Sequence, residues 1–233
     1  MSSKKYIFFD CMETVIDLYN LPKGIDYALW AYEGSGVEHI WKNKTEFIEQ
    51  FTLSQRTFWV STPPYKEHSL EDRLKFLVNK KLKWSSESEQ VEVINSLKSN
   101  FWRNYRSQCY VSEEVRRTLE HLRVNYNLLL ISNLIVEGGI EDLLNMTGLE
   151  NYFNIVLTSI GVGWKKPHPS IYKKALERAD VLPEDTIFVG DDLVNDYVMP
   201  SRMGFRAYLY DRQKVYSYVD NRFSKMSELI EII

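Results

Sequence analysis

A short apolar run at residues 6–9 ends at a carboxylate, Asp10, and a threonine follows four residues later, Thr14. A continuous apolar run of this length is typical of a strand that is covered on both faces of a sheet. Polar groups stand at similar strand ends in three later segments, residues 128–133, 164–167 and 187–196. Open α/β folds bind ligands at the carboxyl ends of parallel strands, so we expect the four segments to meet at one edge of a sheet.

Between residues 111 and 210, short apolar runs alternate with amphipathic patterns, which is typical of βα units on a parallel sheet. With the first run included, strands are predicted at residues 6–10, 128–131, 154–158, 186–190 and 206–210. Helices are predicted between them at residues 112–123, 140–146, 169–179 and 196–203. The sequence therefore predicts an α/β fold with a doubly wound, mainly parallel, Rossmann-like sheet.

Residues 17–107 differ, because their apolar residues recur at helical spacing and no clear strand pattern is present. Helices are predicted at residues 25–32, 44–60, 69–80 and 87–105. This block interrupts the α/β pattern. We therefore expect a core made of residues 1–16 and 108–233 and a separate helical cap made of residues 17–107, with linkers near Asp17 and Gln108.

The composition is that of an ordinary soluble globular protein, with 233 residues, 26% charged residues and a net charge of −3. The mild acidity gives no support for binding to nucleic acid or to a membrane surface. Two cysteines are too few for a disulfide framework, and the apolar runs are too short for a signal peptide or a bilayer span. We expect a cytoplasmic protein that binds a small molecule. Its oligomeric state cannot be read from the sequence.

The segment after the fourth predicted strand contains three carboxylates, Asp191, Asp192 and Asp196. Carboxylates at this spacing repel one another unless a cation binds, and Mg²⁺ prefers oxygen ligands. The alternative is a solvated acidic turn in which Asp196 caps a helix. Asp10 at a neighbouring strand end favours the metal site, and a carboxylate in that position can also act as a nucleophile.

Three further polar groups are candidates for binding an anionic oxygen. Ser132 and Asn133 end the second long strand, where a hydroxyl and backbone N–H groups can bind an anion or simply cap a helix. Lys166 precedes Pro167, which biases its backbone towards an extended conformation and can direct its ammonium group into the site. Its neighbour Lys165 is the weaker candidate.

Together, these segments resemble the motifs of the haloacid dehalogenase-like superfamily of hydrolases. The matching residues are Asp10 and Thr14, then Ser132, then Lys166, and finally Asp191, Asp192 and Asp196. The resemblance implies that Asp10 is the nucleophile, and that Ser132 and Lys166 are catalytic. It implies a substrate site made of Thr14, Ser132, Asn133 and Lys166. For Mg²⁺ it implies the carboxylates of Asp10 and Asp191 and the backbone carbonyl of Met12, with Asp192 or Asp196 acting directly or through water. The helical block lies where the family inserts its cap.

Met12 departs from the pattern of the family's phosphatases, which carry a second aspartate two residues after the nucleophile. That aspartate protonates the leaving oxygen and later activates water, and a thioether has no titratable proton. Glu13 replaces a residue that is usually glycine, and its side chain is expected to point elsewhere. Three subgroups lack the second aspartate: the 2-haloacid dehalogenases, the phosphonoacetaldehyde hydrolases and the P-type ATPases.

The leading interpretation is a Mg²⁺-dependent hydrolase of a small phosphorylated metabolite that reacts through an aspartyl intermediate. A 2-haloacid dehalogenase is the first alternative, because halide leaves without a proton and Ser132-Asn133 is similar to the dehalogenase form. A phosphonate hydrolase is the second, and it requires a cap lysine such as Lys42 or Lys44 to form a Schiff base. The third alternative is a catalytically weak binding protein.

Overall fold

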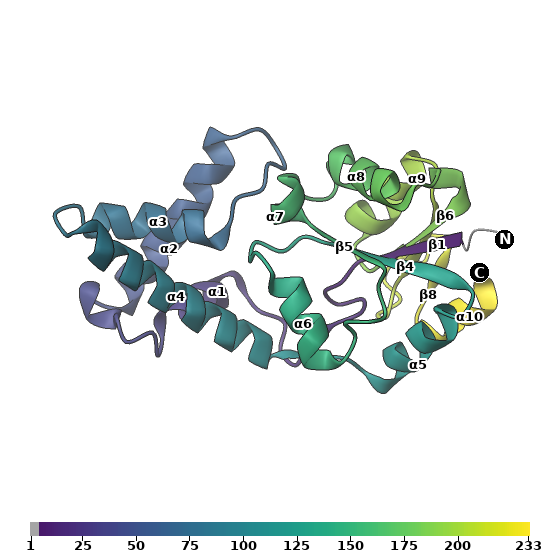
Figure 1. The fold of residues 1–233 in the computed structure, drawn as a ribbon, viewed down its shortest axis with the longest axis horizontal. Coiled ribbons are helices and arrows are strands. Elements are labelled where there is room, and N and C mark those ends of the chain that lie inside the picture. The colour runs from purple at the N-terminus through teal and green to yellow at the C-terminus, as the bar shows by residue number, and fades with distance from the viewer. Residues whose placement is uncertain (1–4) are drawn as a thin grey trace. The chain divides into compact units, whose positions relative to one another are not determined.

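The computed structural model describes residues 5–233, and they form two compact units. The α/β unit contains the chain up to Leu18, Tyr110–Leu134 and Ile140–Ile233. The helical unit contains Tyr19–Cys109 and also Ile135–Gly139, a short segment inside the range that the sequence analysis assigned to the core. Figure 1 shows the elements of both units in chain order.

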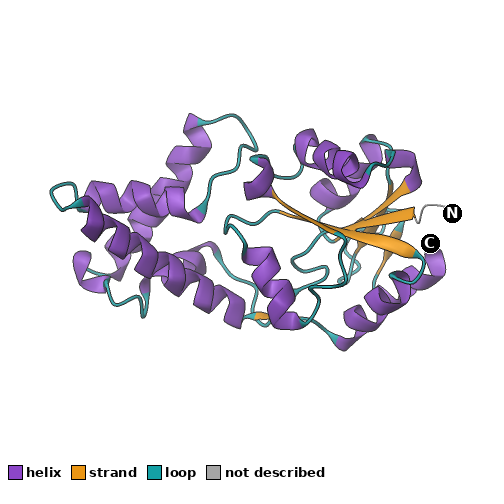
Figure 2. Ribbon diagram, in the orientation of Figure 1, coloured by secondary structure: helices purple, strands orange, loops and turns teal. Residues whose placement is uncertain are grey.

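The α/β unit is built on a sheet of six strands in the order β5-β4-β1-β6-β7-β8, and each neighbouring pair is parallel (Figure 2). The strands are β1 (Lys5–Phe9), β4 (Tyr126–Ser132), β5 (Ile155–Thr158), β6 (Thr186–Gly190), β7 (Arg206–Tyr210) and β8 (Arg222–Phe223). This confirms the predicted doubly wound, parallel sheet. The sequence analysis missed β8, because two residues are too few to show a period.

Helices cover both faces of this sheet, with α8 and α9 on one side and α5 and α6 on the other (Figure 1). Their bounds are α5 (Glu113–Leu122), α6 (Gly139–Thr147), α7 (Ser159–Val162), α8 (Pro169–Ala179), α9 (Met199–Arg202) and α10 (Leu229–Ile232). On the α8 side, Phe8 and Phe188 of the central strands pack with Ile171 and Tyr172. Burial on both faces explains why the strands read as continuous apolar runs.

One helix of the α/β unit begins earlier than predicted. A helix was expected at residues 196–203, but a π-helical segment, η3 (Leu193–Val198), precedes α9. Asp192 is the N-cap of η3, because its Oδ1 accepts hydrogen bonds from the backbone N–H groups of Val194 (2.8 Å) and Asn195 (2.7 Å). Asp196, the cap considered from sequence, therefore lies inside the helical segment.

The helical unit consists of four helices, α1 (Gly24–Tyr32), α2 (Lys44–Ser61), α3 (Leu70–Lys81) and α4 (Glu87–Ser107), with a short 3₁₀ turn, η1 (Glu38–Ile40). Rings of Tyr32, Trp41 and Phe47 pack at centroid separations of 4.8–6.4 Å and form part of its core. Two short strands, β2 (Asp17–Leu18) and β3 (Cys109–Tyr110), pair where the chain enters and leaves this unit. The sequence analysis expected no strand in residues 17–107, and β2 corrects that expectation. Within residues 5–233, no helix is long and apolar enough to cross a membrane.

Candidate active site

The carboxyl ends of three adjacent strands bring the predicted site residues together. β1 lies between β4 and β6, so the position after Phe9 is next to the ends of both neighbours. Asp10 continues the ladder, since its N–H donates to the carbonyl of Val189 at 2.8 Å. Ser132 ends β4 and Gly190 ends β6. The parallel sheet thus places Asp10 beside two residues that each lie more than a hundred positions further along the chain.

Three carboxylates converge at this edge. An oxygen of each of Asp10, Asp191 and Asp196 lies within 4.8 Å of an oxygen of both others. The ammonium of Lys166 donates to Oδ1 of Asp10 at 2.5 Å and to Oδ1 of Asp196 at 2.7 Å. Thr14 Oγ1 donates to Oδ1 of Asp191 at 3.1 Å. Asp10, Thr14, Lys166 and Asp196 are all buried, so the charges interact with little screening by water.

When its three carboxyl groups are ionised, the cluster carries more negative than positive charge, and burial raises the pKa of both Asp191 and Asp196. Burial, followed by repulsion from Asp10 and Glu13, raises the pKa of Asp191 to about 7. Burial opposes the charge of Lys166, but Asp10 and Asp196 together raise its pKa, so its ammonium stays protonated. One ammonium among three close carboxylates leaves an excess of anionic oxygen, and hard divalent cations bind such groups. The donor set therefore fits Mg²⁺.

The backbone after Asp10 forms a tight turn, residues 11–16, which we call the nucleophile turn because it follows the predicted nucleophile. The carbonyl of Cys11 accepts hydrogen bonds from the N–H groups of Val15 and Ile16, both at 2.8 Å, and Glu13 N–H donates to the carbonyl of Ile16 at 2.7 Å. The carbonyl of Met12 accepts no hydrogen bond from residues 5–233. This carbonyl is therefore free to accept a further contact, and its binding of a metal ion stays a prediction.

Ser132 and Asn133 play different parts in the structure. Ser132 Oγ is buried and has no hydrogen-bond partner among the described residues. Leaving such a group unpaired costs about 1–3 kcal/mol, which a bound anionic oxygen would offset. The side chain of Asn133 instead holds the backbone of Lys166, accepting from its N–H at 2.8 Å and donating to its carbonyl at 3.0 Å. Asn133 thus positions Lys166, and its contact with substrate stays a prediction.

Asp192 lies outside the group of three carboxylates, because its side chain caps η3. Its backbone N–H donates to Oδ2 of Asp196 at 3.1 Å, so Asp192 helps to orient Asp196. Of the two candidates for the additional metal contact, the structure brings Asp196 to the site.

Gly190 is a site residue that the sequence analysis did not single out. A Cβ at this position would lie 2.4–2.5 Å from side-chain atoms of Asp196, which is far inside van der Waals contact. Asp196 cannot easily move away, because Lys166 and Asp192 hold both of its oxygens. Glycine is therefore required here for close approach, and the adjacent Gly190-Asp191 pair was the available signal.

We expect Gly190→Ala to displace Asp196, to lower the free energy of unfolding by about 1–3 kcal/mol, and to weaken Mg²⁺ binding. Thermal unfolding and calorimetric Mg²⁺ titration measure the two effects. Gly24→Ala is the matched control, because a Cβ there meets no atom within 4 Å. Equal behaviour of the two variants would contradict the close-approach argument.

The sequence of this chain is similar to a known family and to individual proteins. The model of a family described as haloacid dehalogenase-like hydrolase matches residues 43–209. A relative from Xenopus laevis, haloacid dehalogenase-like hydrolase domain-containing protein 3, is 42% identical over 80 residues, which cover 34% of this chain and 32% of the relative. A glyceraldehyde 3-phosphate phosphatase from Pyrococcus furiosus is 33% identical over 92 residues, covering 36% of this chain and 38% of the phosphatase. The matched part thus spans only about a third of each of these two proteins.

A solved structure resembles the whole fold. The crystal structure of a 2-haloacid dehalogenase from Pseudomonas syringae pv. Tomato superposes with a TM-score of 0.79 over 99% of this chain and 98% of that protein. The two sequences are 22% identical, so the likeness concerns the fold alone.

Proposed function

This chain belongs to the haloacid dehalogenase-like hydrolase family, and from that premise we propose that it is a Mg²⁺-dependent hydrolase of a small phosphoric monoester that reacts through Asp10. Membership confirms the resemblance drawn from the motifs. The observation that carries the proposal is the cluster of Asp10, Asp191 and Asp196 around Lys166, beside the unpaired hydroxyl of Ser132. Further support comes from the relative in Pyrococcus furiosus that is named a phosphatase.

The carboxylates of Asp10 and Asp191 and the carbonyl of Met12 would hold the Mg²⁺, with Asp196 acting directly or through water. When bound, the ion supplies charge neutralisation and orientation for the phosphoryl group. Two protein groups also suit that task. Ser132 Oγ has a free donor, and Lys166 carries a retained positive charge.

In the proposed reaction, an oxygen of Asp10 forms a bond to phosphorus while the bond from phosphorus to the ester oxygen breaks. The ester oxygen leaves with the electron pair and takes a proton from solvent. The oxygen of a water molecule then bonds to phosphorus while the bond from phosphorus to Asp10 breaks, which releases phosphate and restores the carboxylate. Met12 can neither protonate the leaving oxygen nor activate that water. We therefore propose that good leaving groups, such as aryl alcohols, react faster than alkyl alcohols.

A 2-haloacid dehalogenase is the second candidate, because Met12 does not hinder the departure of halide. Its weakness is the acidic cluster, which dehalogenation does not use. Assays of an aryl phosphate, a 2-haloacid and phosphonoacetaldehyde, each with Mg²⁺ and with a chelator, separate the candidates. We expect phosphate release from the aryl phosphate that requires Mg²⁺. Halide release in the presence of chelator would replace the phosphatase proposal with the dehalogenase.

The pKa of Asp191, about 7, predicts that Mg²⁺ affinity falls as pH drops below neutrality. The ion must then displace a proton, so affinity should fall by up to about tenfold per pH unit below 7, with release of up to about one proton. Calorimetry at pH 6 and pH 8 in buffers of different ionisation enthalpy measures both quantities. A pH-independent affinity, or an Asp191→Asn variant that binds Mg²⁺ as tightly as wild type, would contradict the site.

The raised pKa of Asp191 also makes the free energy of unfolding of the metal-free protein depend on pH, in a direction that can be stated. The folded-state pKa of Asp191 lies above its ordinary value of 3.8, so the protonated side chain favours folding. This contribution is complete below the unfolded pKa and is lost as pH rises through about 7. Without metal, the contribution of Asp191 to the free energy of unfolding should therefore decrease as pH rises from 4 to 7. Mg²⁺ binding should reverse this loss of stability.

A further inference from the structure

Arg212, two residues after the end of β7, reaches back to the segment that follows the nucleophile. Its Nη1 donates to Oδ1 of Asp17 at 2.7 Å, and its Nη2 donates to the backbone carbonyl of Glu13 at 2.6 Å. The guanidinium also lies over the ring of Tyr210, 5.2 Å from its centroid. All four residues belong to the α/β unit. One side chain thus joins the end of β7 to a turn about 200 positions earlier in the chain.

The turn that Arg212 contacts has a strained backbone. Glu13 has a φ of 63°, in the left-handed region that L-residues seldom adopt. A residue in this conformation is strained and persists only where its surroundings hold it. Its N–H is held by the carbonyl of Ile16, and its carbonyl is held by Arg212. Removing the guanidinium frees one of these two anchors.

The nucleophile turn directly follows Asp10, and one of the two acceptors of Arg212, the Glu13 carbonyl, lies within it. Met12, with its unpaired carbonyl, directly precedes Glu13, so the peptide that Arg212 binds is next to the predicted metal ligand. A hydrogen bond from a charged donor is stronger than one from a neutral donor, and the planar guanidinium serves two acceptors at once. Arg212 uses two separate nitrogens for the two acceptors, and lysine has one nitrogen, so it cannot place donors at both positions.

We propose that Arg212 is a positioning residue for the reaction, an inference that rests on the proposed phosphatase function. By binding the Glu13 carbonyl and Asp17 together, Arg212 holds the nucleophile turn in the one arrangement that presents Asp10 and the Met12 carbonyl to the metal and the substrate. It acts through the turn and does not contact the reacting atoms.

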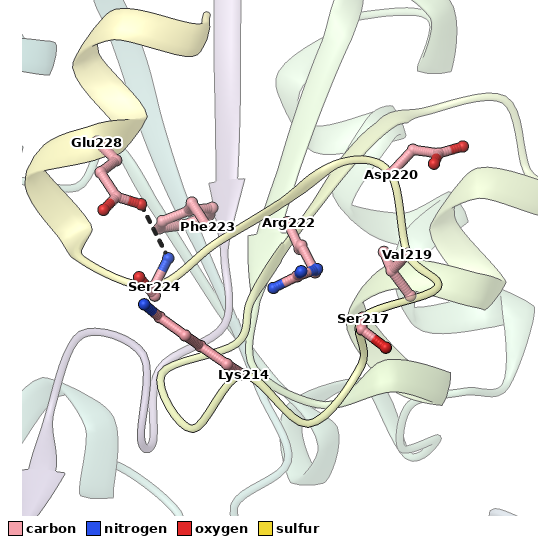
Figure 3. Close-up of a pocket in the computed structure, with 8 residues that line it drawn as sticks. All are labelled: Lys214, Ser217, Val219, Asp220, Arg222, Phe223, Ser224 and Glu228. Carbon is pink, nitrogen blue, oxygen red and sulfur yellow. Dashed lines mark hydrogen bonds between the residues drawn. The ribbon is translucent and has the colours of Figure 1, made fainter.

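A second arginine offers a matched control. Arg222 of β8 lines a surface hollow together with Lys214, Ser224 and Glu228 (Figure 3). Its Nη1 lies 3.7 Å from Oδ2 of Asp211, and no contact joins it to the nucleophile turn among the described residues. Arg222→Gln removes the same charge from the same part of the sheet and leaves the turn untouched.

The test compares Arg212→Gln, Arg212→Lys and Arg222→Gln. In the metal-free protein, hydrogen exchange of the Val15 and Ile16 amides should accelerate by about tenfold or more in Arg212→Gln, because the turn opens more often. With Mg²⁺ and an aryl phosphate, kcat should fall by about 10–100-fold with little change in KM, and Mg²⁺ affinity should also fall. Arg212→Lys should be intermediate, and Arg222→Gln should match wild type.

Several results would overturn the inference. One is a rate of amide hydrogen exchange at Val15 and Ile16 that is the same in Arg212→Gln as in Arg222→Gln. Another is exchange that rises evenly across the α/β unit, which indicates a general loss of stability. A third is full rescue by lysine, which would show that charge alone matters. If wild type hydrolyses no phosphate ester, the proposed function fails, while the exchange and Mg²⁺ measurements still decide whether Arg212 holds the turn.

Discussion

Replacing Asp10 with asparagine is expected to lower aryl phosphatase turnover by on the order of 10⁴–10⁶-fold, because the amide cannot form the bond to phosphorus. The substitution preserves the size of the side chain. Lys166 also keeps its partner Asp196, so the buried ammonium is not left unpaired. Steady-state rates, with thermal unfolding as a check on folding, measure the effect.

The control for this loss is Asp220→Asn, which removes an exposed carboxylate of the same unit. It should leave both turnover and the unfolding temperature unchanged. If Asp10→Asn retained more than about a tenth of wild-type turnover, Asp10 would not be the nucleophile. Mass spectrometry of the wild type, quenched during turnover, adds a direct observation, since an aspartyl phosphate at Asp10 raises the mass of its peptide.

Met12→Asp is expected to produce the largest gain, because it supplies the acid–base group that the site lacks. General acid–base catalysis contributes about 10²–10⁴-fold, which is the upper bound for the increase in turnover. The gain should be larger for alkyl than for aryl phosphates, since alkyl leaving groups depend more on protonation. Measuring kcat with both substrate classes gives the contrast.

Met12→Asn is the matched variant, since it has the shape of aspartate without a titratable proton. It should gain nothing. If the wild type already turned over as fast as Met12→Asp, another residue would supply the proton, and Glu13 is the first to test. Burial, and to a lesser extent Asp10 and Asp17, raises the pKa of Glu13 although Arg212 opposes the shift. A fall in rate on Glu13→Gln would then identify it.

The sequence alone determined the longer strands β1, β4, β5, β6 and β7, most helices and the meeting of four motifs at one sheet edge. These features depend on local periods and on a general rule: buried parallel strands read as apolar runs, and their carboxyl ends lie together. Asp10, Ser132 and the acidic segment are therefore neighbours in the structure as the sequence predicted. The starts of the helices predicted at residues 69–80 and 112–123 were also readable, because their caps, Ser69 and Ser112, bond within three residues of themselves.

Only the tertiary structure decided how the polar groups divide their tasks. Asp192 and Asp196 look equivalent in sequence, but the early start of η3 makes Asp192 a cap and turns Asp196 towards Lys166. The sequence also does not show that Asn133 binds the backbone of Lys166, or that Arg212 binds the carbonyl of Glu13. The physical reason is the same in each case. These contacts join residues distant in the chain through side-chain directions that arise only when strands and loops are packed, and no local period encodes them.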